Sequence, residues 1–214
     1  MDETKPAPVV FERDSPEFAR VMAFTDGVFA IAVTLLVLDV TIPADLAADD
    51  LPAALWDLRW QIFSFFLSFT VIGLYWMLHH KLTSRMRGID RRFMRWNLVQ
   101  LAFIAFLPFP TSLVGEHSEA AIAVAVYAVN VAIVSALDTW LFRTASHRGL
   151  LDESWPPGAT AFALAARFVP VPVFLVSVPI AWVSTSWARW TWILVVPASL
   201  IVDRFRPAGL DPDS

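Results

Sequence analysis

The sequence predicts an all-α integral membrane protein with six transmembrane helices per subunit. Of its 214 residues, 57% are hydrophobic and only 17% are charged, and the mean hydropathy is +0.59. A soluble domain would carry about 25% charged residues. The charges also gather in short stretches between apolar segments of about 20 residues, the length that an α-helix needs to cross the hydrocarbon core.

The predicted spans follow these apolar segments along the chain. They cover residues 20–41, 55–79, 93–114, 119–142, 158–179 and 186–204. Ser15 and Pro16 form a helix start before the first span, because serine caps a helix N-terminus and proline fits the first turn. The sixth span is the least regular, since Arg189 and Pro197 interrupt its apolar run.

Basic residues set the predicted orientation. All of the 16 lysines and arginines except Arg59, Arg167 and Arg189 lie near the N-terminus, in the second and fourth loops, or in the C-terminal tail. Cytoplasmic loops are enriched in these residues, so both termini are predicted to be cytoplasmic. The chain then divides into a disordered cytoplasmic tail (1–17), a transmembrane domain (18–205) and a short cytoplasmic C-terminal tail (206–214).

The composition argues against several classes of function. The chain has no cysteine, which excludes disulfides and thiol chemistry. It has no Gly-x-Ser-x-Gly, His-Glu-x-x-His or Walker sequence, so nothing indicates an enzyme or a bound cofactor. A net charge of −4 and the lack of a basic groove-reading motif argue against nucleic-acid binding. The expected partner is therefore the lipid bilayer.

The first span begins with a charged motif, in which Arg20 is followed by Phe24, Thr25 and Asp26. This pattern resembles the Arg-x-x-x-Phe-Ser-Asp hallmark of the lysosomal potassium channel family, the transmembrane protein 175 type, and its prokaryotic homologues. Thr25 stands where the family usually has serine and keeps the hydroxyl group. The resemblance covers about the first half of the chain and continues in Tyr75-Trp76-x-x-His79, Asn97 and Leu107-Pro108-Phe109.

The resemblance implies a potassium-permeable leak channel of the bacterial plasma membrane. Prokaryotic members have one six-helix repeat per subunit and resemble tetramers, with four copies of the first helix around the pore. Potassium is then the permeant ion, selected only modestly over sodium. By the same resemblance, Ile31 corresponds to a hydrophobic constriction, Thr34 to a hydroxyl-bearing selectivity layer, and Leu38 to a second apolar ring.

The spacing of these residues agrees with a pore-lining face. Ile31, Thr34, Leu35 and Leu38 stand at i, i+3, i+4 and i+7 and share one side of a helix. Apolar rings can gate a pore by dewetting, so Ile31, Leu35 and Leu38 are the predicted gate. The alternative is a packing or lipid-facing stripe, with Thr34 bonded to the backbone of its own helix.

The charges at the start of this helix predict a structural polar network. Arg20 and Asp26 lie about 120° apart around the axis and should not pair directly. An isolated charge at membrane depth costs a few kcal/mol, so partners on other helices are expected. The candidate members are Arg20, Thr25, Asp26, His79, His80 and Asn97. No metal site is predicted, because the adjacent histidines point about 100° apart on a helix.

Two further charges lie inside predicted spans, and they leave alternatives open. Asp138 is expected to pair with an arginine. Arg167 forms a structural pair, extends its side chain toward the membrane surface by snorkelling, or marks a substrate pathway. The prolines around Arg167 would suit a broken helix at a transport site. A small secondary transporter or a proton-permeable channel that uses Asp26, Asp138 or Arg167 is therefore the alternative to the potassium channel.

Overall fold

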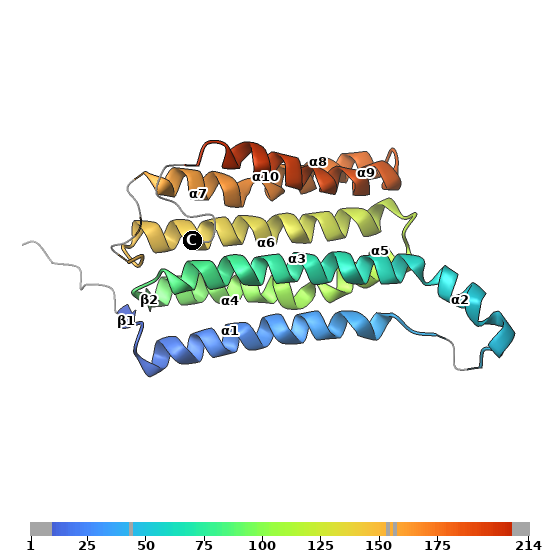
Figure 1. The fold of residues 1–214 in the computed structure, drawn as a ribbon, viewed down its shortest axis with the longest axis horizontal. Coiled ribbons are helices and arrows are strands. Elements are labelled where there is room, and N and C mark those ends of the chain that lie inside the picture. The colour runs from blue at the N-terminus through green and yellow to red at the C-terminus, as the bar shows by residue number, and fades with distance from the viewer. Residues whose placement is uncertain (1–9, 43–44, 153–154, 156–157, 207–214) are drawn as a thin grey trace, which may run out of the picture.

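The computed structural model of this chain is a bundle of long helices that run alongside one another (Figure 1). It describes residues 10–42, 45–152, 155 and 158–206. Within this part of the chain, five helical stretches are long and apolar enough to cross a membrane, and they match the first five predicted spans. These are Pro16–Asp39, Arg59–Ser84, Arg91–Glu116, Ala121–His147 and Ala159–Ala181.

Several of these stretches are composite. The first joins α1 (Pro16–Leu35) to the 3₁₀ helix η1 (Leu36–Asp39), and η2 (Ala48–Asp50) and α2 (Leu51–Asp57) lead into α3 (Arg59–Ser84). The third joins α4 (Arg91–Phe106) to α5 (Pro108–Glu116), the fourth is α6 (Ala121–His147), and the fifth joins α7 (Ala159–Phe168) to α8 (Pro170–Ala181). The breaks before Pro108 and Pro170 follow from proline, which cannot donate a backbone hydrogen bond to the preceding turn.

The predicted start of the first helix is confirmed. Ser15 is the N-cap of α1, its hydroxyl oxygen accepts from the backbone N–H of Phe18 at 3.2 Å, and Pro16 occupies the first turn. Asp90 caps α4 in the same way, accepting from the N–H of Phe93 at 2.8 Å. Local capping therefore sets where both helices begin.

The sixth predicted span is not one of the five membrane-length helices. Residues 186–204 fall on α9 (Thr185–Thr191), η3 (Trp192–Leu194) and α10 (Val195–Asp203), which follow one another along the chain. Arg189 and the polar and tryptophan residues of α9 lower the hydropathy of this segment. Trp192 nevertheless fixes it to the bundle, because its indole N–H donates to Ser177 Oγ at 2.9 Å and its ring stacks on Tyr127.

The prediction that residues 1–17 are disordered is wrong for the described residues 10–17, which contain a strand and the start of a helix. Val10–Glu12 forms β1, which pairs antiparallel with β2 (Gly88–Asp90), Val10 lying opposite Asp90. Gly88 permits this close pairing, since a Cβ atom there would lie 2.5 Å from the carbonyl oxygen of Phe11. Residues 16 and 17 belong to α1. Residues 1–9 and 207–214 of the predicted tails lie outside the described residues.

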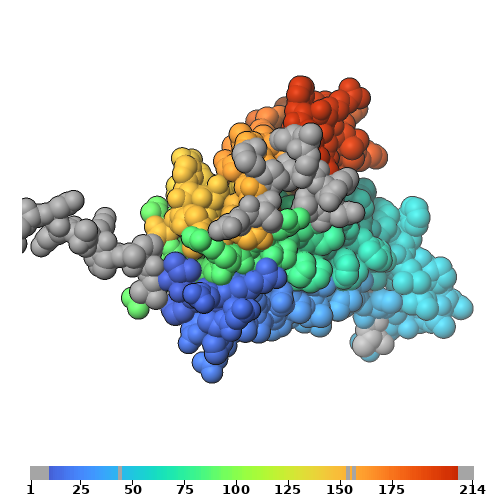
Figure 2. Space-filling view, turned by 60° about the vertical axis from the view of Figure 1, so that its left-hand side comes forward, coloured from blue at the N-terminus to red at the C-terminus, as the bar shows by residue number. Residues whose placement is uncertain are grey.

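The core of the bundle is α6, which packs against α4, α5, α7 and α8. In its most apolar window 61% of the residues are buried, against 22% in the stretch that contains α1. Figures 1 and 2 place α1 at one edge of the molecule and the C-terminal helices at the opposite edge. Helix α1 therefore has a large uncovered surface.

One end of the bundle carries most of the basic residues, and we call it the basic end. It holds β1, β2, the start of α1 and α4 and the end of α3 (Figure 1). Arg13 donates there to the carbonyl oxygen of Ser84 at 2.5 Å, and Arg148 at the end of α6 forms an ion pair with Asp90. These contacts hold the ends of α3, α4 and α6 together.

Candidate functional site

Helix α1 has one buried and one uncovered face, and the predicted gate residues lie on the uncovered one. Ile31 and Leu38 are 60% and 64% exposed, and Leu35 is also exposed. On the opposite face, Phe29 and Ala32 are buried in the core of the bundle. The subunit thus presents an apolar stripe that its own helices do not cover, and a membrane protein would cover it with lipid or with other subunits.

Thr34 is the polar residue of this stripe. It is exposed, and its hydroxyl donates to the backbone carbonyl of Ile31 at 2.9 Å. The bond uses the single donor of the hydroxyl and leaves lone pairs on its oxygen. The geometry therefore combines the two interpretations offered by the sequence. The side chain is tied to its own helix, and its oxygen can still meet a cation.

A buried hydrogen-bonded chain attaches α1 to two neighbouring helices, and we call Thr25, His79 and Asn97 the anchor network. The amide of Asn97 on α4 donates to Thr25 Oγ1 on α1 at 2.8 Å. Its carbonyl oxygen lies 2.9 Å from Nε2 of His79 on α3, which fixes that nitrogen as the donor. All three side chains are nearly fully buried. Because buried polar groups are costly without partners, the network specifies how α1 sits on α3 and α4.

The other three predicted members lie outside the anchor network. Asp26 is exposed and accepts from the indole N–H of Trp76 on α3 at 3.0 Å. His80 stacks on the same indole, with ring centroids 5.6 Å apart. Arg20 is exposed and has no hydrogen bond or ion pair to the described residues. The expectation that His79, His80 or Asn97 would hold these two charges is thus corrected, since Thr25 and not Asp26 faces Asn97.

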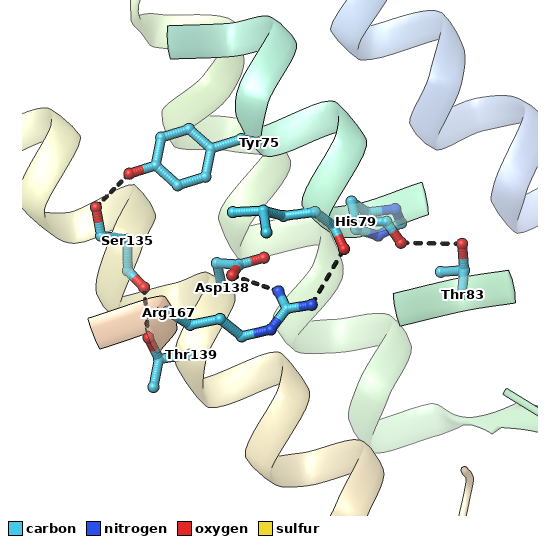
Figure 3. Close-up of polar contacts among 8 residues, drawn as sticks. Tyr75, His79, Thr83, Ser135, Asp138, Thr139 and Arg167 are labelled. Carbon is cyan, nitrogen blue, oxygen red and sulfur yellow. Dashed lines mark hydrogen bonds and ion pairs between the residues drawn. The ribbon is translucent and has the colours of Figure 1, made fainter. Parts of the chain in front are cut away.

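Asp138 and Arg167 pair with each other. Arg167 Nη1 on α7 lies 2.6 Å from Asp138 Oδ2 on α6, and its Nη2 donates to the carbonyl oxygen of Leu78 on α3 at 3.2 Å (Figure 3). The side chains are 10% and 1% exposed. The pair therefore ties three helices together, as the structural interpretation of these charges expected.

Sequence analysis missed two polar contacts close to these residues. One is the hydrogen bond of Asp26 to Trp76, a residue that the sequence names only as part of the Tyr75-Trp76-x-x-His79 resemblance. The other is the buried hydrogen bond between the hydroxyls of Tyr75 on α3 and Ser135 on α6 (Figure 3). The buried positions on α3 with hydrogen-bonded polar side chains are Ser64, Ser68, Tyr75, His79 and Thr83, and most of them are spaced four residues apart. That spacing was a usable signal for an inward polar face.

We expect Asn97→Ala to destabilise the fold by about 1–3 kcal/mol, because it leaves Thr25 and His79 buried without this partner. The checking measurement is the thermal unfolding of the detergent-purified protein. Leu98→Ala is the matched control on the same helix, because Leu98 is exposed and exposed substitutions change stability little. Equal unfolding temperatures for both variants would contradict the anchoring role.

Comparison with known proteins identifies the family. A sequence profile described as endosomal/lysosomal potassium channel TMEM175 matches residues 20–108. A curated potassium channel of Chamaesiphon minutus is 33% identical over 178 residues, which are 80% of this chain and 87% of that protein. This chain belongs to the TMEM175 family. The crystal structure of a lysosomal potassium-selective channel TMEM175 homologue from the same organism superposes with a TM-score of 0.71 at 28% identity, covering 87% of this chain and 98% of that one.

Mammalian members match over a shorter region. The endosomal/lysosomal proton channel TMEM175 of Rattus norvegicus is 39% identical over 97 residues, which are 42% of this chain and 19% of the rat protein. The profile match at residues 20–108 contains the uncovered apolar stripe and the whole anchor network, whereas Asp138 and Arg167 lie beyond it. As a multi-pass membrane protein of the TMEM175 family, the chain is an ion channel homologue and not an enzyme.

Proposed function

We propose that this TMEM175-family protein is a potassium-permeable leak channel that prefers potassium modestly over sodium. Four subunits would form a homotetramer in which four copies of α1 surround the pore. Ile31, Leu35 and Leu38 would form the hydrophobic constriction, and Thr34 the selectivity layer. The potassium channel named in Chamaesiphon minutus supports the choice of ion.

The observation that carries this proposal is the uncovered stripe of α1. A helix at the edge of a subunit exposes Ile31, Leu35 and Leu38 together with one hydroxyl, while its other face is buried. A pore lined by four such helices gives apolar rings that impede water and a ring of threonine oxygens that replaces part of the hydration shell of an ion.

The same proposal fixes the placement in the membrane. The basic end would face the cytoplasm of a bacterial cell, with the protein in the plasma membrane, because lysine and arginine are retained on that side. The segment α9–η3–α10 would form the sixth span. At 1.5 Å per residue its helical length is about 28 Å, close to the thickness of the hydrocarbon core. Both termini would then be cytoplasmic.

Proton permeation is the second candidate function. It is favoured by the rat relative, which is named a proton channel, and by the match of that relative to nearly half of this chain. The secondary-transporter alternative has less support. Its candidate coupling groups Asp138 and Arg167 are occupied by each other and by a backbone carbonyl.

The test is ion flux from potassium-loaded liposomes that contain the purified protein. We expect Thr34→Ala to keep potassium flux but to lower the potassium-over-sodium preference about two- to threefold, because the ring of four threonine oxygens that replaces part of the hydration shell of the ion is lost. Thr139→Ala on α6 is the control, because the Thr139 hydroxyl also donates to a carbonyl of its own helix, that of Ser135 at 2.9 Å, and Thr139 lies outside the proposed pore.

Three outcomes decide between the candidates. If Thr34→Ala keeps the potassium-over-sodium preference of the wild type, Thr34 does not form the selectivity layer. Flux that follows a pH gradient and not a potassium gradient would establish the proton channel instead. Flux that saturates and needs a second ion would support the secondary transporter. Arg167→Met would then lower the flux more than any substitution on α1.

A further inference from the structure

A pocket at the basic end is lined by several basic side chains. It encloses about 190 Å³ between the end of α3, α7 and the end of α10. The charged residues among its described lining are Lys81, Arg85, Arg167, Arg206 and one acid, Asp203. Arg206 Nη2 forms an ion pair with Asp203 Oδ1 at 3.0 Å, and the Lys81 side chain is exposed. Arg167 is paired with Asp138, and among the described residues the Lys81 side chain has no acidic partner, so the pocket keeps a positive charge that an anionic group can meet.

An apolar groove continues from this basic pocket along α3. It has a volume of about 670 Å³ and lies between α3 and the C-terminal segments α8–α10. Leu78, Ala166 and Arg167 line both cavities, so the two are contiguous. From Leu78 to Trp60 the groove follows α3 for about 27 Å, at 1.5 Å per residue. It is long enough to hold an extended acyl chain.

The groove opens outward rather than into the core. Leu74 and Val196 on its rim are 49% and 61% exposed. The C-terminal helices that form one wall lie at the edge opposite α1 (Figure 2). In a tetramer built around α1, which rests on the proposed function, this wall lies at the periphery and faces the hydrocarbon of the bilayer. A lipid molecule and not a second subunit is therefore the occupant with access to it.

We propose that the basic pocket and the apolar groove together form a binding site for one anionic phospholipid per subunit. The phosphate group would lie between Lys81 and Arg206, and one acyl chain would fill the groove beside Leu74. Anionic headgroups bind to basic pockets between transmembrane helices on the cytoplasmic side.

The test is native mass spectrometry of the purified full-length protein titrated with phosphatidylglycerol or phosphatidylcholine. We expect phosphatidylglycerol to bind at least about tenfold more tightly, with one molecule per subunit. Lys81→Gln and Arg206→Gln should each weaken its binding about fivefold, the effect of one basic residue near an anionic lipid, and weaken phosphatidylcholine binding less, because choline offsets the charge of its phosphate. Arg92→Gln is the matched control, because Arg92 is exposed at the same end but does not line the pocket.

A second pair of variants tests the groove separately. Leu74→Trp should weaken binding of both lipids, whereas Leu98→Trp, at an exposed leucine outside the groove, should weaken neither. Equal binding of the two lipids, or equal losses in Arg92→Gln and Lys81→Gln, would overturn the headgroup site. Displacement of phosphatidylglycerol by millimolar inorganic phosphate would show a simple anion site and overturn the lipid assignment. The same spectra give the oligomeric state, so loss of the tetramer and loss of the lipid are distinguished.

Discussion

Ile31→Asn is expected to raise potassium flux about tenfold or more. Ile31 lies on the uncovered stripe of α1, one turn before Thr34, and is 60% exposed in the subunit. Four isoleucine side chains around a narrow pore repel water, and an ion cannot pass without it. Asparagine is smaller than isoleucine and hydrogen-bonds water, so the variant both widens and wets the constriction. Lowering the barrier by about 1.4 kcal/mol is enough for a tenfold increase in rate.

The measurement is potassium flux into liposomes at equal protein content. Ile122→Asn is the control, because Ile122 is 63% exposed but lies on α6, outside the proposed pore. It should leave flux unchanged. Equal flux in the wild type and in Ile31→Asn would mean that α1 does not form the constriction, whatever ion the protein carries. A rise in both variants would point to a leak caused by polar residues in the bilayer.

The predictable part of the fold comes from local signals. The hydrophobic length of each segment and the Ser15-Pro16 start of α1 are properties of neighbouring residues, and both were predicted. The β1–β2 pair was not, because strands of three residues carry little pattern and depend on the close approach allowed at Gly88. The tail therefore looked disordered from its charges and prolines, although its last part contacts the second loop.

The candidate site was predictable to the extent that family resemblance named its residues. The motif placed Thr25, Asp26, His79 and Asn97 near one another, but not which of them bond. Thr25 and Asp26 are adjacent on α1 and point about 100° apart, so the rotation of the helix about its axis decides which one faces Asn97. That rotation is set by the packing of Phe29 and Ala32 into the core, which sequence spacing does not resolve.

Arg167→Met is expected to destabilise the protein by about 3–5 kcal/mol. Removing the guanidinium leaves Asp138, which is 1% exposed, as an unpaired buried carboxylate. Oδ1 of Asp138 already lacks a hydrogen-bond partner among the described residues, so the ion pair satisfies the carboxylate only at Oδ2. The loss should be visible as a lower unfolding temperature in detergent. Arg95→Met, at an exposed arginine, should change this temperature little.

The double variant Asp138→Leu/Arg167→Met separates structure from transport. Replacing both members of a buried ion pair by apolar residues is often neutral or stabilising, so stability should return to near that of the wild type. If the pair is structural, potassium flux also returns, because no charge of the pair lies on the route of the ion. Recovered folding without recovered flux would show that Asp138 or Arg167 acts on the transported ion, and the pore would then not be confined to α1.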